Sequence, residues 1–421
     1  MMKKRFLSGL LTGILCTVLI GSLVLLGFDR ISGNTSDNGN SIISEETGAS
    51  NQTAEELAAK QEVAVFDKKL TYIKSIINKY YLGEVTNEQF DTGILKGLLE
   101  ALDDPYSCYY TAEEYAALMQ SSDGVYCGIG SLVSQNAKTG VITIVKPFVD
   151  GPAYKAGMLP GDIIYKVNGT EVTGTDLSTV VSQMKGEKGT NVIVTVVREG
   201  EEDPLDLVIT RDEIEVPTVE YEMLEDNIGY IYVMEFDKVT VSQFKNAIED
   251  LTKQGMKGLV VDLRDNPGGL YDSAVAMLDR MLPEGLIVYT ETKDGTRDEE
   301  YSDNKEFFDL PLAVLINGNS ASASEIFAGA IQDYGIGTLV GTQSFGKGIV
   351  QSVIPLYDGS AVKITVSKYY TPNGRSIHET GITPDVEVEL EEGLSKQLVI
   401  THDEDNQLQK AVEVILKQIG E

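Results

Sequence analysis

The chain has 421 residues, of which 42% are hydrophobic, so it is long enough for two or three domains with ordinary buried cores. Its 34 basic and 65 acidic residues give a formal net charge of −31. A surface this acidic argues against nucleic acid as a partner and against adhesion to anionic lipid headgroups. The sequence contains no Cys/His cluster with metal-site spacing, so we expect neither a metal nor an organic cofactor.

The N-terminus predicts a membrane anchor. Lys3, Lys4 and Arg5 precede an uncharged apolar run over residues 6–28, which is long enough to span a bilayer and whose basic flank belongs in the cytoplasm. A cleaved signal peptide is the alternative, but it would have a shorter apolar core and a small-residue cleavage site. We find no convincing site of that kind. We therefore expect a transmembrane signal anchor over residues 1–30, with the rest of a single-pass protein on the extracytoplasmic side of the cell membrane.

The rest of the chain changes character several times. A stretch rich in Ser, Gly, Asn and Thr has no apolar period and is typical of a flexible linker. A helical region follows it, then a module of short β-rich runs, and then buried strands alternating with helices, which indicate an α/β core. The predicted segments are the linker 31–53, the N-terminal helical region 54–123, the β-rich module 124–212, the α/β core 213–390 and the C-terminal helical region 391–421.

Two cysteines, Cys108 and Cys127, lie beyond the predicted anchor, in a compartment that permits disulfides. The sequence alone does not show whether their Cα atoms lie within the distance that a disulfide requires. We favour two buried free thiols over a disulfide.

A serine-rich stretch, "NGNSASASE", raises the question of a nucleophile. Residues 312–316 predict a strand, residues 317–319 a turn, and a helix begins near Ser320 to Ser322. A serine at such a junction lies beside the N–H groups and the positive end of the helix, which favour developing negative charge. The alternative is structural, because Ser322 and Glu325 have the S-x-x-E spacing of a helix capping box.

The proton acceptor for such a serine is the second question, since the chain contains only two histidines. His402 lies in a polar stretch and is expected to be solvated, and His378 lies in a loop beside glycine-rich sequence. Lys347, between two glycines in "SFGKGIVQ", is the better base, and strand periodicity places Gln351 on the same face. The stretch also fits the phosphate-loop pattern G-x-x-x-x-G-K. However, a glycine replaces the Mg²⁺-binding Ser/Thr and a strand follows instead of a helix.

Two glycine motifs complete the candidate sites. In "LRDNPGG", Gly268 or Gly269 could direct a backbone N–H toward a reacting carbonyl, although a tight turn alone would explain the motif. In "YCGIGSLV", residues Gly128, Ile129 and Gly130 precede a strand of the β-rich module. Such a loop can offer backbone amides to a C-terminal carboxylate while the strand pairs with an extended peptide.

Taken together, the motifs resemble those of the carboxyl-terminal processing, or tail-specific, serine proteases that carry a PDZ domain. The matching segments are "YCGIGSLV", "GPAYKAGMLPGDIIYKVNG", "DLRDNPGG", "SASASE", "FGKGIVQ" and "YYTPNGRSIHETGITPD", which cover the chain from about residue 70 to its end. Asn319 stands where the family commonly has glycine. The resemblance implies an α/β protease core, with a PDZ domain inserted after the N-terminal helical region.

Residue by residue, the resemblance implies that Ser322 is the nucleophile, Lys347 the base and Gln351 its support. It implies backbone oxyanion donors at Gly268 and Ala323. Ser320 and Ser324 are then packing or capping residues.

The predicted function is that of a membrane-anchored serine endopeptidase with a Ser-Lys dyad that cleaves protein or peptide substrates near their free C-termini. The resemblance further implies that the PDZ domain gates the site and that the terminal helical regions help to form a homodimer. The alternative is a non-catalytic PDZ scaffold with a degenerate protease-like core, against which the intact Ser322, Lys347 and Gln351 argue.

Overall fold

The structure is a computed structural model that describes residues 54–303, 305–394 and 400–420. These residues belong to two compact units, which meet in the chain between Asp104 and Pro105 and are described separately. The predicted anchor and linker, residues 1–53, lie outside the described residues. Among the helices that are described, none is long and apolar enough to cross a membrane.

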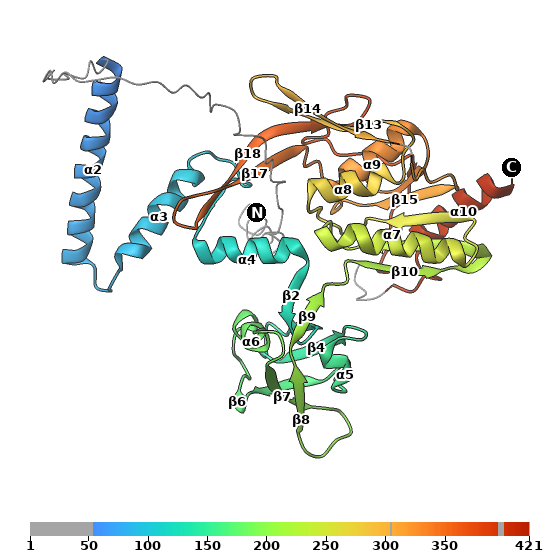
Figure 1. The fold of residues 1–421 in the computed structure, drawn as a ribbon, viewed down its shortest axis with the longest axis horizontal. Helices are drawn as coiled ribbons and strands as arrows, with labels where there is room; N and C mark the ends of the chain where they lie inside the picture. Colours follow the sequence, from blue (N-terminus) through green and yellow to red (C-terminus); the bar gives the residue numbers. More distant parts are fainter. Residues whose placement is uncertain (1–53, 304, 395–399, 421) are drawn as a thin grey trace, which may run out of the picture. The chain divides into compact units, whose positions relative to one another are not determined.

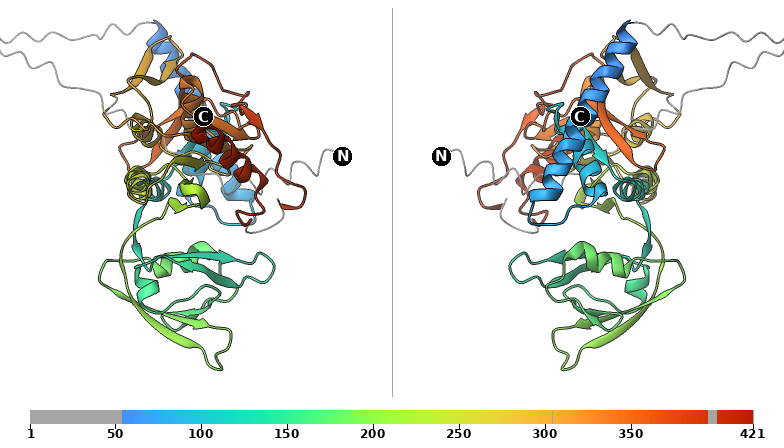
Figure 2. Two further views of the ribbon diagram at one scale, coloured as in Figure 1. Left: turned by 90° about the vertical axis from the view of Figure 1, so that its right-hand side faces the viewer. Right: turned by 90° about the vertical axis from the view of Figure 1, so that its left-hand side faces the viewer.

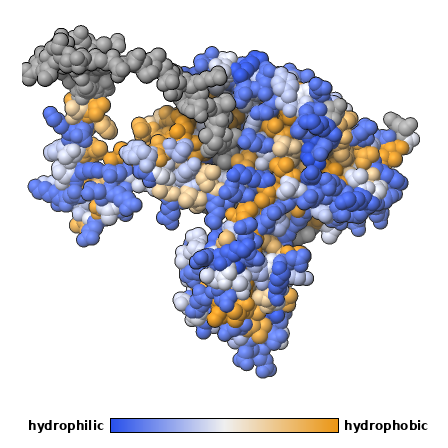
Figure 3. Space-filling view, viewed as in Figure 1, coloured by the Kyte–Doolittle hydropathy of each residue, from blue (hydrophilic) through white to orange (hydrophobic). Residues whose placement is uncertain are grey.

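The smaller unit contains two helices, α2 (Ala54–Tyr80) and α3 (Asn87–Glu100). Thr86 fixes the start of α3 with a capping box: its hydroxyl accepts the Gln89 N–H, and the Gln89 side chain accepts the Thr86 N–H. Several large side chains of α2 are exposed, and Figure 3 shows patches of orange, hydrophobic surface on this helix. They include Val63, Val65, Phe66, Tyr72, Ile73 and Ile76.

The larger unit begins with β1 (Cys108–Tyr110) and α4 (Ala112–Asp123), after which β2 (Val125–Gly128) and β9 (Asp212–Glu215) form an antiparallel pair. Between these two strands lies the β-rich module, drawn in green in Figures 1 and 2. Its sheet has the order β3-β4-β5-β7-β8, with β6 paired to β5. The elements are β3 (Ser131–Gln135), β4 (Ile142–Pro147), α5 (Pro152–Lys155), β5 (Ile163–Val167), β6 (Thr170–Glu171), α6 (Leu177–Met184), β7 (Asn191–Val197) and β8 (Leu205–Thr210).

A mostly parallel sheet in the order β10-β11-β12-β15-β16-β19 forms the α/β core, with β10 antiparallel to β11. All residues of β12 and β15 are buried, as expected for strands covered on both faces. The strands are β10 (Val219–Met223), β11 (Ile228–Val233), β12 (Gly258–Asp262), β15 (Leu312–Ile316), β16 (Thr338–Gly341) and β19 (Val386–Glu387). A short 3₁₀ turn, η1 (Glu225–Asn227), connects β10 to β11.

Helices cover both faces of this sheet. Three of them, α7 (Lys238–Lys253), α8 (Tyr271–Asp279) and α9 (Ala323–Tyr334), share one apolar cluster with alternate residues of the strands (Figure 1). The intervening strand residues, such as Val260 and Leu315, pack instead against α10 (Asn406–Gly420) on the other face.

A second, antiparallel sheet has the order β1-β18-β13-β14, with β17 paired to β18 directly after the loop that contains Lys347. Its remaining strands are β13 (Gly285–Thr292), β14 (Arg297–Ser302), β17 (Ile349–Pro355) and β18 (Ala361–Tyr370). The pairing of β1 with β18 joins residues more than 250 positions apart in the chain. Sequence patterning did not predict this sheet.

The structure also tests the predicted elements around the serine-rich stretch and the predicted state of the two cysteines. The strand at residues 312–316, the helix after it and the C-terminal helix are confirmed. Cys108 and Cys127 are free thiols, as favoured, but both are partly exposed and not buried.

Candidate active site

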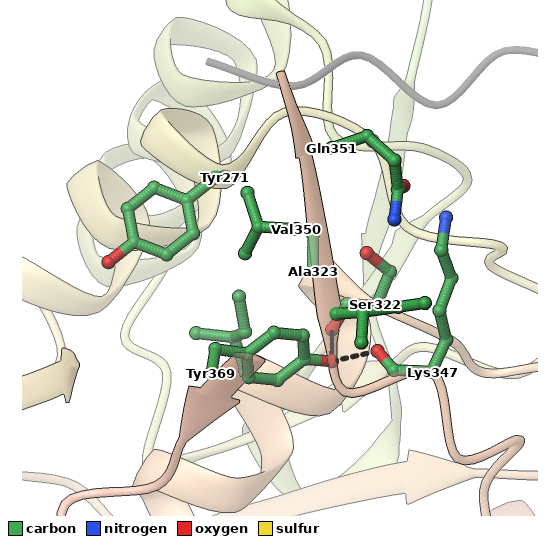
Figure 4. Close-up of a pocket in the computed structure, with 10 residues that line it drawn as sticks. Tyr271, Ser322, Ala323, Lys347, Val350, Gln351 and Tyr369 are labelled. Atoms are coloured by element: carbon green, nitrogen blue, oxygen red, sulfur yellow. Dashed lines mark hydrogen bonds between the residues drawn. The ribbon is translucent and has the colours of Figure 1, made fainter. Parts of the chain in front are cut away.

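Ser322 lies where β15 turns into α9, at the N-cap of that helix. Its backbone has φ 55° and ψ −113°, outside the regions that residues other than glycine normally occupy. A conformation of this kind costs about 1–3 kcal/mol and persists only where the surrounding structure enforces it. The Ser322 side chain projects into a cavity that Lys347 and Gln351 also line (Figure 4).

Glu325, in the first turn of α9, holds both sides of this site together. Its fully buried carboxylate accepts the Ser322 N–H at 2.9 Å and the Lys347 N–H at 2.8 Å. It also accepts the Gly346 N–H at 2.7 Å and the Ser344 hydroxyl. Burial raises the pKa of Glu325, and these hydrogen bonds act in the opposite direction. The capping partner predicted from sequence therefore also fixes the loop that carries the lysine.

Lys347 is only 2% exposed, and its ammonium nitrogen lies 4.5 Å from the centre of the Tyr106 ring. Its loop packs closely against residues 378–381. A Cβ added to Gly348 would lie 2.5 Å from the backbone nitrogen of His378, which explains why glycine follows the lysine. In Figure 4 the amine of Lys347 points toward the Gln351 amide and past the Ser322 hydroxyl.

Gln351 reaches the cavity from β17, whose buried residues alternate at Ile349, Gln351 and Val353, as strand periodicity predicts. The pairing of β17 with β18 shifts register between Val350 and Gln351, where β18 contains one extra residue. The Gln351 amide donates to the Thr365 hydroxyl at 3.3 Å. A second residue of β18, Tyr369, points its hydroxyl at the carbonyl oxygens of both Lys347 and Ser322 (Figure 4).

The cavity itself is small. Its volume is about 20 Å³, which is room for about one water molecule.

The "LRDNPGG" segment packs directly against Ser322. A Cβ at Gly268, where φ is 107°, would lie 2.7 Å from the Ala321 carbonyl oxygen and 3.0 Å from the Ala323 nitrogen. The two predicted oxyanion donors thus lie side by side. However, the Gly268 N–H donates to the Asn266 side chain at 2.8 Å, and Gly269, not Gly268, lines the cavity.

The flanking serines attach α9 to this same segment. The Ser320 hydroxyl donates to the Leu263 carbonyl at 2.7 Å, and the Ser324 hydroxyl donates to the Asn266 carbonyl at 2.9 Å. Both side chains are fully buried and make backbone contacts, as expected for packing residues. Of the three serines, only Ser322 lines the cavity.

Comparison with known proteins agrees with this geometry. Residues 227–388 match the family model of Peptidase family S41, residues 144–198 match the PDZ domain, and residues 29–114 match the N-terminal domain of the activating protease CtpB. The carboxy-terminal-processing protease of Bartonella bacilliformis is 43% identical over 303 residues, which are 70% of this chain and 68% of that protein. The chain belongs to the carboxy-terminal processing proteases of peptidase family S41.

Two further relatives extend the likeness. The carboxy-terminal processing protease CtpA of Bacillus subtilis is 38% identical over 326 residues, which are 77% of this chain and 69% of that protein. The carboxyl-terminal-processing protease of Synechocystis sp. is 34% identical over 341 residues, which are 80% of this chain and 79% of that protein. The resemblance predicted from the motifs is confirmed, and with it the assignment as a serine-type endopeptidase with a PDZ domain.

The PDZ domain of this protease presents the predicted peptide loop at one edge of its sheet. Within the described residues, β3 pairs only with β4, so its other edge is open to an added strand. The loop before it is rigid: Ile129 is buried and its carbonyl accepts the Ala153 N–H, while Gly130 has φ 71° and its carbonyl accepts the Phe148 N–H. The Ser131 hydroxyl at the start of β3 is buried, with no hydrogen-bond partner among the described residues.

The two histidines are not positioned as bases for Ser322. His402 lies 3.8 Å from Glu222 and is partly exposed, and His378 contacts the lysine loop through its backbone. Neither lines the cavity that contains Ser322 and Lys347. The residues that sequence reasoning missed are Tyr106 and Tyr369, neither of which gave a local signal. Glu325 was predicted as the capping partner of Ser322, but its contacts with the lysine loop were not.

Proposed function

We propose that this protease is a membrane-anchored endopeptidase that uses Ser322 and Lys347 as a catalytic dyad and cuts protein substrates near their C-termini. The observation that carries the proposal is the position of Ser322, strained at a helix N-terminus and lining one cavity with the buried Lys347. Glu325 and Tyr369 bind the backbone of both residues, which keeps the two side chains together.

In the proposed reaction, the Ser322 oxygen attacks the substrate carbonyl while its proton passes to the neutral amine of Lys347. The resulting ammonium returns that proton to the leaving amine as the peptide bond breaks. Water, deprotonated by the same lysine, then hydrolyses the acyl-enzyme. Burial favours the neutral amine that this scheme requires, and Gln351 orients it.

The oxyanion in this reaction is stabilised by the N–H groups of Ala323 and Gly268. The Gly268 N–H now donates to Asn266, so the donor has to be shared with, or released by, that side chain when substrate binds. The small cavity beside Ser322 is consistent with a resting site that opens further when substrate binds. Opening of the site on binding of a substrate C-terminus to the PDZ domain would account for both features.

The test of the dyad compares matched serine variants. Ser322→Ala should lose both peptide cleavage and labelling by a serine-directed fluorophosphonate. Ser320→Ala should keep substantial activity, because the Ser320 hydroxyl bonds Leu263 and Asn317 and does not line the cavity. Lys347→Arg should also be inactive, since guanidinium cannot act as a base near neutral pH. A folded wild-type protein that neither cleaves nor labels would favour a PDZ scaffold, and an active Ser322→Ala form would exclude the dyad.

The anchor and the oligomeric state are part of the same proposal. The apolar run at residues 6–28 supports an extracytoplasmic, membrane-attached enzyme, which should be released from membranes by detergent and not by salt. The exposed apolar side chains of α2 support a homodimer, and sedimentation of the wild type and of a Phe66→Glu variant would test it.

A further inference from the structure

Tyr106 places its aromatic face against the amine of Lys347. The nitrogen lies 4.5 Å from the ring centre, inside the range of a cation–π interaction, and the lysine side chain is almost fully shielded from water. Such interactions are strongest when the cation is desolvated. The role predicted for Lys347 from sequence took no account of this ring.

The backbone around Tyr106 is fixed by the strand that also supports Gln351. The hydroxyl of the next residue, Ser107, accepts the Thr365 N–H at 3.0 Å. After it, β1 pairs with β18, with Cys108 opposite Lys363. The hydroxyl of Thr365 in turn accepts from the Gln351 amide. One strand, β18, therefore sets the positions of the ring and of the amide that flank the lysine.

We propose that Tyr106 is a positioning residue for the base: its ring face holds the Lys347 amine beside Ser322 and stabilises the ammonium that forms when the amine accepts the serine proton. This inference rests on the Ser-Lys mechanism proposed above. The ring forms no bond and takes no proton; the proton moves from the Ser322 oxygen to the lysine nitrogen and then to the leaving amine. Its contribution is electrostatic and grows as positive charge develops.

The same ring also favours the ammonium of the resting enzyme, so its removal has two opposite effects. The amine becomes neutral at lower pH, and the transition state loses part of its stabilisation. The kcat/KM profile of an enzyme without the ring's negative face should thus begin its rise at lower pH and reach a lower plateau. A loss of packing alone would lower the whole profile without moving its midpoint.

Other titratable groups contact the lysine loop and must be held constant. Glu325 of α9 binds the Lys347 N–H, Tyr369 of β18 approaches the Lys347 carbonyl, and His378 packs against Gly348. Burial raises the pKa of Tyr369, to which Glu325 and then Tyr106 add. A comparison between phenylalanine and fluorinated phenylalanine at position 106 removes the phenol from both proteins and leaves the other groups unchanged.

The experiment measures kcat/KM for a short peptide from pH 5 to 10 with three substitutions at position 106. Tyr106→Phe should keep the wild-type midpoint. Trifluorophenylalanine keeps the shape of the ring, but its fluorines draw electron density away from the ring face. It should lower the midpoint by about one pH unit, which is a tenfold change in the dissociation constant of the base, or about 1.4 kcal/mol. Tyr106→Leu should shift the midpoint in the same direction.

Tyr110→Leu is the matched control, because it removes the neighbouring pair in which Lys363 lies 5.5 Å from the Tyr110 ring. It should leave the midpoint unchanged. Equal midpoints for the phenylalanine and trifluorophenylalanine enzymes, or a uniform loss without a shift, would overturn the role of Tyr106. Activity in Ser322→Ala would instead refute the mechanism on which the inference rests, so the two failures are distinguishable.

Discussion

Glu325→Gln is the substitution that most directly tests how the site is held together. One carboxylate oxygen accepts the N–H groups of Ser322 and Lys347, and the other accepts the Gly346 N–H and the Ser344 hydroxyl. Glutamine has one acceptor oxygen and one NH₂ group, so one of these pairs loses its acceptor. The less costly orientation places NH₂ beside Ser344, whose hydroxyl can rotate, and leaves the Gly346 N–H without a partner.

An unsatisfied buried donor costs about 1–3 kcal/mol, and the gain from removing a buried charge offsets part of that cost. We therefore expect Glu325→Gln to fold, with an unfolding free energy lower by at most about 3 kcal/mol. Activity should fall much further, because displacement of the Lys347 loop by about 1 Å can reduce the rate about 100-fold. Urea unfolding and kcat/KM, measured on the same sample, separate the two effects.

The matched control is Glu114→Gln. Glu114 occupies the same capping-box position in α4 and accepts the Thr111 N–H at the same 2.9 Å, but on an exposed helix. That variant should lose less than about 1 kcal/mol of stability and keep its activity. Wild-type kcat/KM in a folded Glu325→Gln enzyme would show that the carboxylate caps α9 and does nothing for the lysine.

Gly268→Ala should abolish cleavage and destabilise the fold, because the added methyl would lie 2.7 Å from the Ala321 carbonyl oxygen. The control is Gly295→Ala, which also has a positive φ but has open space around the added methyl, and this variant should cleave normally. Burial, and then the charge of Asp237, raises the pKa of Glu235 to about 8 from its usual 4.5. The folded state then binds more protons than the unfolded chain between these pH values, so stability should decline as pH rises from about 4.5 to 8. Glu235→Gln should flatten that decline in urea titrations, and an unchanged slope would contradict the assignment. Amidation of a substrate peptide's C-terminus should weaken its binding to the PDZ domain by about 1.5–3 kcal/mol, roughly tenfold to a hundredfold, in calorimetry; equal binding of acid and amide forms would exclude carboxylate capture.

The sequence carried more information about the site than about the fold around it. A continuous apolar strand, a short turn and a helix placed Ser322 at a strand end, and two glycines placed Lys347 in a loop before a strand. These local signals predicted the elements that carry the two candidate residues. They left a capping role for Ser322 open, and the family resemblance was what assigned the nucleophile and the base.

Non-local pairings could not be predicted in this way. Tyr106 precedes a three-residue strand that pairs with β18, and nothing in its neighbourhood in the sequence indicates that partner. The register shift opposite Gln351 could not be predicted either, because the extra residue lies on the opposing strand, β18, while β17 keeps its alternation. Each of these features arises where distant segments of the chain meet.

The capping box shows that the structural interpretation of "SASASE" and the proposed catalytic one are compatible. A cap needs a carboxylate at the third helical position that reaches back to the N-cap N–H, and Glu325 does this. The same carboxylate is deep enough in the core to accept two further N–H groups from the lysine loop. Because one group satisfies the helix start and the loop together, the strained backbone of Ser322 and the position of Lys347 cannot vary independently. A substitution that relaxed the helix start would therefore also release the proposed base.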